Sequence, residues 1–112
     1  MITADLDPFE LVETTPGSWS LVLRELDLTV HTEVFEAAGA EGNGYDWASI
    51  ALALVERDAE HLVGRFGTDP EAEAFVAYGA DPTVLTELGE LLLEVYNDAD
   101  LLADLATIAE WE

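Results

Sequence analysis

Residues 42–58 read Gly-Asn-Gly-Tyr-Asp-Trp-Ala-Ser-Ile-Ala-Leu-Ala-Leu-Val-Glu-Arg-Asp and predict the central helix of the molecule. From Tyr45 to about Asp58, apolar residues recur at the spacing of a helix face. The expected apolar stripe is Trp47, Ile50, Ala51 and Leu54, widened by Tyr45, Ala48, Leu52 and Val55. A helix that is apolar over so much of its circumference is expected to lie at the centre of a fold.

The segments before this helix predict a hairpin and a further helix. Residues 9–13 and 19–26 are expected to be strands, because they flank a Thr-Pro-Gly-Ser stretch at 15–18 with turn chemistry. One face of the second strand is apolar, with Trp19, Leu21 and Leu23. Residues 28–38 change to helical spacing at Val30, Val34 and Phe35, and Gly39 is a natural stop.

The segments after the central helix complete a mixed fold. Residues 60–65 either continue that helix or form a second short turn, residues 68–71 form a turn, and residues 74–78 form a strand that ends at Gly79. Asp81 and Pro82 supply the cap and first position of the next helix, and residues 97–100 cap a last one. The residues expected to be buried are Leu85, Leu88, Leu92 and Val95, then Leu101, Leu105 and Ile108.

This order predicts an α+β fold, a small antiparallel sheet with helices packed on one face. The chain shows no linker, low-complexity tract or internal repeat, so residues 1–112 are expected to form a single domain. The strong negative charge does not indicate disorder, because half of the residues are hydrophobic and their arrangement is periodic.

The charge bounds the possible partners. Asp and Glu total 25 against three Arg and no Lys, and the net charge is -22. Phosphate recognition needs clustered Lys or Arg, so we expect neither unaided nucleic-acid binding nor attraction to an anionic membrane. Such a field attracts a basic protein surface or cations. Adaptation to a salt-rich cytoplasm, or solubility alone, would explain the charge equally simply.

Other features of the composition narrow location and chemistry. The chain has no Cys, which removes disulfides, thiolate chemistry and Cys-type zinc sites. Its first residues lack the basic and apolar regions of a signal peptide, and no apolar run approaches the roughly eighteen residues of a membrane span. The expectation is a soluble cytoplasmic protein.

Metal-binding and catalytic patterns are missing. Asp98, Asp100 and Asp104 lack the ligand order of an EF-hand, and His61 has no second His at ligand spacing. In a chain with 25 acids, pairs of carboxylates carry no information about acid–base work. No nucleophile elbow or phosphate loop is present. We therefore expect no metal, no cofactor and no enzymatic activity.

The glycine-rich start of the central helix has two compatible interpretations. Structurally, Asn43 caps the helix, Asp46 reaches back as in a capping box, Gly42 and Gly44 allow a tight loop, and Trp47 enters the core. Functionally, the loop would present Tyr45, Asp46 and Trp47 to a partner, since aromatic residues anchor interfaces.

The Gly-Asn-Gly-Tyr-Asp-Trp-Ala-Ser stretch followed by an apolar helix resembles immunity protein family 51, one of the immunity families of bacterial polymorphic-toxin systems. Residues 69–78 and the Leu-rich helix after Asp81 are also similar to that family. The resemblance runs from about Leu28 to Ile108, whereas residues 1–18 resemble no family.

The resemblance implies a small α+β protein, encoded beside a secreted toxin, that binds the toxin domain and protects the producing cell. It implies neither catalysis nor a cofactor. The candidate partner-binding residues that it carries over are Asn43, Gly44, Tyr45, Asp46 and Trp47.

The first hypothesis is therefore an immunity protein that neutralises a cognate, basic toxin domain through an acidic surface. The alternative is an acidic nucleic-acid mimic or adaptor that regulates a basic nucleic-acid-binding protein. A third possibility, a small domain adapted to high salt, predicts folding that depends on molar salt.

Overall fold

The structure is a computed structural model that describes residues 6–24 and 29–111. The predicted strand end at Leu26 and helix start at Leu28 lie outside the described residues. In chain order the elements are β1 (Glu10–Thr15), β2 (Ser18–Arg24), the 3₁₀ turn η1 (Thr29–His31), α2 (Thr32–Ala37), α3 (Gly44–Asp58), the 3₁₀ turn η2 (Glu60–Leu62), β3 (Gly67–Thr68), β4 (Ala74–Gly79), α4 (Pro82–Tyr96) and α5 (Ala99–Ile108).

The strands form one antiparallel sheet in the order β1-β2-β4-β3. β2 and β4 lie at its centre, where Leu21 faces Ala77 and Leu23 faces Phe75 across the ladder. All four of these side chains are buried on the inner face. For Leu21 and Leu23 this is the face that the alternation in β2 predicted. Tyr78 points to the opposite face and is 49% exposed. The predicted α+β fold with a small antiparallel sheet is confirmed.

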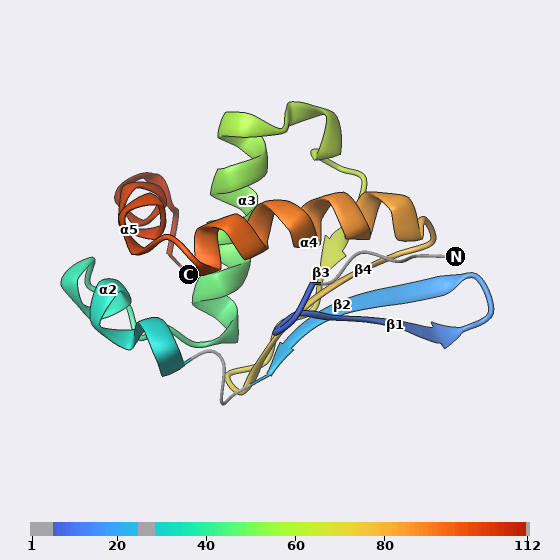
Figure 1. The fold of residues 1–112 in the computed structure, drawn as a ribbon, viewed down its shortest axis with the longest axis horizontal. Helices are drawn as coiled ribbons and strands as arrows, with labels where there is room; N and C mark the ends of the chain where they lie inside the picture. The colour runs from blue at the N-terminus through green and yellow to red at the C-terminus, as the bar shows by residue number, and fades with distance from the viewer. Residues whose placement is uncertain (1–5, 25–28, 112) are drawn as a thin grey trace.

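The helices cover the inner face of the sheet. α4 contacts β1, β2 and β4, and α3 contacts β4. Figure 1 shows α3 (green) and α4 (orange) crossing beside the sheet, while α2 (cyan) and α5 (red) lie together at the end remote from the β1–β2 hairpin. α4 begins as expected, with Asp81 accepting a hydrogen bond from the Thr83 N–H and Pro82 in the first turn.

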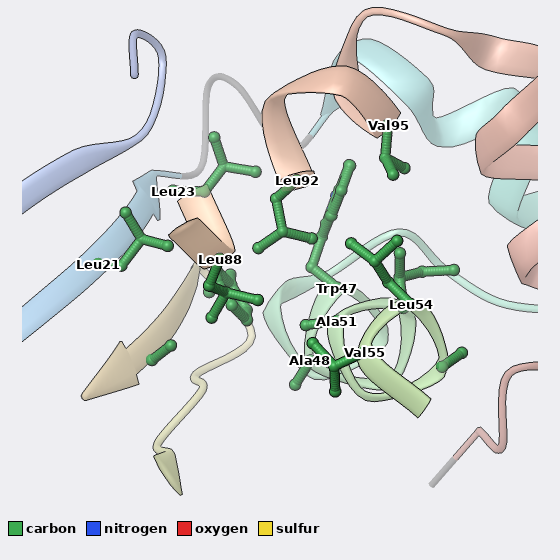
Figure 2. Close-up of a cluster of buried hydrophobic side chains, with 14 of the residues drawn as sticks. Leu21, Leu23, Trp47, Ala48, Ala51, Leu54, Val55, Leu88, Leu92 and Val95 are labelled. Carbon is green, nitrogen blue, oxygen red and sulfur yellow. The ribbon is translucent and has the colours of Figure 1, made fainter. Parts of the chain in front are cut away.

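A single cluster of buried side chains joins the sheet to α3, α4 and α5. Trp47 projects from α3 toward α4 and lies beside Leu92 and Val95 (Figure 2). The predicted buried face of α4 is confirmed in full, since each of the four residues expected there is inaccessible to solvent: Leu85, Leu88, Leu92 and Val95.

Two details of the elements differ from the predictions. β3 was missed, because a two-residue strand carries no periodicity and is defined only by its pairing with β4. In α5, Leu105 is buried as expected, but Leu101 is only half-buried and Ile108 is exposed, while Leu102 and Ala106 are buried instead. The apolar residues of α5 form two overlapping stripes, and packing against α3 and α4 decides which stripe is covered.

Two positions of α3 also differ. The widened stripe predicted burial of Tyr45 and Leu52, yet they are 45% and 44% exposed. Both lie on the side of α3 away from Trp47. The core therefore covers most of the helix but leaves one side open.

Candidate functional site

The candidate site is the loop that leads into α3, with the first turn of that helix. Asn43 is the N-cap, and its side-chain oxygen accepts a hydrogen bond from the Asp46 N–H at 2.9 Å. The Asn43 amide also donates to the Glu41 carboxylate at 3.1 Å. The predicted capping role of Asn43 is confirmed.

Asp46 fixes the loop from beneath. Its side chain is only 7% exposed, and its Oδ2 atom accepts hydrogen bonds from the backbone N–H groups of Glu41 and Gly42, both at 2.8 Å. A capping box would have joined this carboxylate to the Asn43 N–H. The left-handed φ of +83° at Gly42 turns the chain, so that the two preceding N–H groups face the carboxylate instead. A carboxylate in the first helical turn is further favoured by the helix dipole.

Gly44 fixes the loop against the sheet. Its N–H donates to the Ala72 carbonyl at 3.3 Å, and a Cβ atom built on it would lie 2.0 Å from the carbonyl oxygens of Glu71 and Ala74. Because those oxygens belong to the backbone, only glycine fits at this position. The first turn of α3 is thereby held against the β3–β4 connection.

Trp47 lies entirely in the core, with no solvent exposure. Its ring packs against Phe9, Phe35 and Tyr96 at centroid distances of 6.4, 5.5 and 6.0 Å. Its indole N–H has no hydrogen-bond partner among the described residues. The structure thus confirms the core position predicted for Trp47.

The five predicted residues therefore occupy one loop at different depths. Tyr45 is exposed, Asn43 is half-buried, and Gly44, Asp46 and Trp47 are buried. Tyr45 and Asn43 line an open groove of about 580 Å³ together with Trp111. Trp111 was missed by sequence reasoning, because it follows the last predicted helix and is brought here only by the tertiary fold.

The electrostatics of the described surface are strongly negative. Asp46 is the single buried carboxylate within residues 6–24 and 29–111. Each of the three arginines lies within 4.0 Å of a carboxylate, in the pairs Arg24–Glu10, Arg57–Asp58 and Arg65–Asp81. Hydrogen bonding to Arg57 lowers the pKa of Asp58. Each arginine is therefore paired with a carboxylate, and the remaining acids make the electrostatic potential of the surface negative.

Two of the residues considered as possible metal ligands make other contacts. Asp98 caps α5, where its side chain accepts from the N–H groups of Asp100 and Leu101 at 3.1 Å. His61 contacts the carboxylate of Glu87. In the part of the chain that the structure describes, no three His, Asp or Glu side chains gather as a metal site would require. No helix among the same residues has the length and apolar character to cross a bilayer.

Residues 9–110 match the family model described as Immunity protein 51. The chain belongs to this family. The match begins upstream of Leu28, where the resemblance in the sequence was expected to start, and so includes the β1–β2 hairpin. The expectation that residues 1–18 lie outside the family is therefore wrong for residues 9–18. Comparisons with curated proteins and with solved structures gave no match. Membership of the family makes the chain an immunity protein, and its loop at residues 42–47 lies within the matched range.

Proposed function

We propose that the chain binds a cognate bacterial toxin domain in the cytoplasm and neutralises it, with residues 1–112 acting as one domain. The family match over residues 9–110 carries this proposal. Neutralisation then needs no chemistry from the chain, because a protein bound over the active cleft of a toxin blocks its substrate. The chain is accordingly proposed to act without a cofactor and not to be an enzyme.

The surface charge supports a basic partner. Toxin domains that attack nucleic acids must be basic to hold phosphates. An inhibitor with a net charge of -22 would associate with such a domain faster than a neutral protein, because opposite fields steer the encounter. Fast association matters when each free toxin molecule acts catalytically.

The loop at residues 42–47 is the proposed contact region. Tyr45 and Asn43 would touch the partner, and the proposal is supported by the fact that both line the open groove. Gly44, Asp46 and Trp47 would contribute from below, by holding that loop in one conformation. A preorganised loop binds more tightly, because little ordering is left to occur on binding.

The test is growth rescue. The chain is co-expressed with the toxin domain encoded immediately upstream of it, and in parallel with an unrelated toxin of the same activity class. The expected result is survival with the neighbouring toxin alone. Death in both cultures, with folded and abundant chain, would contradict the proposal. Rescue from both toxins would favour the nucleic-acid mimic or adaptor, which should bind several basic proteins.

A further inference from the structure

Three apolar side chains that the sequence pattern places in the core gather instead on one open face. Tyr45 and Leu52 are seven residues apart on α3 and therefore lie on the same side of it. Ile108, at the end of α5, is 50% exposed and lies beside Leu52 at the rim of a second groove of about 230 Å³. Scattered exposed apolar residues are ordinary, but a contiguous group marks an interaction surface.

Trp111 joins these residues into one surface. It lines both grooves, the one beside Tyr45 and the one beside Leu52 and Ile108. Its ring is held by Phe35 at a centroid distance of 5.9 Å, and Phe35 in turn packs against Trp47 at 5.5 Å. The buried Trp of the glycine-rich loop thus supports the ring that borders both grooves.

Carboxylates surround this surface. Glu41 lines the larger groove, while Glu56 and Glu110 line the smaller one, and all three are exposed. An aromatic and aliphatic centre with a charged rim is the usual composition of a protein interface. We name the set Tyr45, Leu52, Ile108 and Trp111, with Glu41, Glu56 and Glu110, the Tyr45–Trp111 face.

The negative charge of the Tyr45–Trp111 face indicates which kind of partner can bind there. A second copy of the chain would bring the same glutamates and a further net charge of -22 against it. Like charges opposed across an interface cost several kcal/mol. A cationic segment has the complementary sign, and an Arg or Lys side chain entering between Tyr45 and Trp111 would gain cation–π attraction as well as the field of Glu41.

We propose that the Tyr45–Trp111 face is the docking surface for the toxin domain, and that the toxin inserts a cationic side chain between Tyr45 and Trp111. This inference rests on the proposed function and assigns it to one side of the molecule. The open face of the sheet, which carries Tyr78, is then not part of the interface.

The test measures binding of the chain to the purified toxin domain encoded upstream, made inactive by substitution in its own catalytic site. Tyr45→Ala is expected to weaken binding about 30-fold or more, as removal of a central aromatic anchor does. Tyr78→Ala is the matched control, since it removes a similarly exposed tyrosine from the outer face of the sheet. Its affinity is expected to stay within about threefold of the wild type, because it lies outside the interface.

Two further comparisons protect the test against misfolding and against a general charge effect. The double variant Leu52→Ser/Ile108→Ser is compared with the double variant Val12→Ser/Val63→Ser, since Val12 and Val63 are also exposed apolar residues. Replacing the three rim glutamates by Gln is compared with the same change at Glu13, Glu90 and Glu94, which are exposed elsewhere. The rim set is expected to weaken binding about tenfold more than its control set. Thermal unfolding of every variant confirms the fold.

The outcomes separate the two proposals. If the wild-type chain does not bind the toxin domain, the proposed function fails. If the wild type binds and the folded face variants bind equally well, the Tyr45–Trp111 face is not the docking surface. Loss of a homodimer in the same variants, seen by light scattering, would show that a second copy occupies the face and would also overturn the inference.

Discussion

A Cβ atom at Gly44 would lie 2.0 Å from the backbone carbonyl oxygen of Ala74. Real Cβ atoms do not approach carbonyl oxygens so closely, so the start of α3 and the first residue of β4 fit together only because residue 44 is glycine. This contact sets the position of the loop relative to the sheet. It explains one glycine of the motif through packing alone.

Gly44→Ala is expected to lower the free energy of unfolding by about 3 kcal/mol or more, because the backbone at Glu71 and Ala74 must move. Gly39→Ala is the control. Gly39 has a positive φ of 84° but open space around it. Its replacement should therefore lower the free energy of unfolding by only roughly 1–2 kcal/mol, because the added Cβ strains the left-handed backbone. Urea unfolding measures both. An equal or smaller loss at Gly44 would contradict the close fit.

Trp47→Ala is expected to destabilise the chain by about 3–5 kcal/mol and could unfold it, since the ring is fully buried among aromatic neighbours. Tyr45→Ala, two residues away and exposed, should change stability by less than about 1 kcal/mol. Thermal unfolding of the two variants compares them directly. Similar melting temperatures would mean that Trp47 is not part of the core.

Asp46→Asn is expected to cost about 1–2 kcal/mol, because hydrogen bonds to a charged acceptor are stronger than those to an amide. The loss should appear locally, as faster amide exchange at Glu41 and Gly42, whose N–H groups the carboxylate accepts. Asp100→Asn makes the same change of charge at an exposed position and should leave those two amides protected. Unchanged exchange in Asp46→Asn would exclude this role.

The Glu10–Arg24 pair on β1 and β2 gives a pH prediction. Hydrogen bonding to Arg24 lowers the pKa of Glu10 in the folded chain. The pair therefore adds stability above the ordinary pKa of a glutamate, and this stability is lost as the pH falls through the lowered pKa. Because both side chains are largely exposed, the contribution is small. An NMR titration of Arg24→Gln should show the Glu10 pKa raised; no change would contradict the pairing.

Salt is expected to act in opposite directions on folding and on binding. Added salt screens the repulsion among 25 acids, so the isolated chain should melt at a moderately higher temperature. Association with a basic toxin should slow markedly over the same range, with little change in dissociation. An association rate independent of salt would exclude steering. A chain that folds only in molar salt would favour the salt-adaptation hypothesis.

The sequence predicted the elements with strong periodicity and the core they form. α4 follows this rule, because its apolar residues occupy one stripe between a clear cap and a polar end. α3 does not, since it is apolar almost all round and the pattern cannot say which side stays open. Tyr45 and Leu52 are exposed because, within residues 6–24 and 29–111, no element packs on that side, which is a property of the tertiary fold.

The sequence predicted the helix cap at the candidate site, but not the hydrogen-bond partners of Asp46 or the presence of Trp111. The order of Asn43 and Asp46 indicated a helix cap, yet the partners of the Asp46 carboxylate depend on the backbone turn at Gly42. Trp111 could not be assigned to the site, because residues 59–110 separate it from α3 in the chain. Only the fold brings its ring to Phe35 and to the groove beside Tyr45.

The most direct measurement is calorimetric titration of the purified chain into the purified toxin domain proposed as its partner, with an assay of the toxin's activity on the same mixture. We expect a one-to-one complex with a Kd below about 10⁻⁷ M, and full inhibition of the toxin when the chain is equimolar with it. No complex, or a toxin that stays fully active in excess chain, would contradict this expectation.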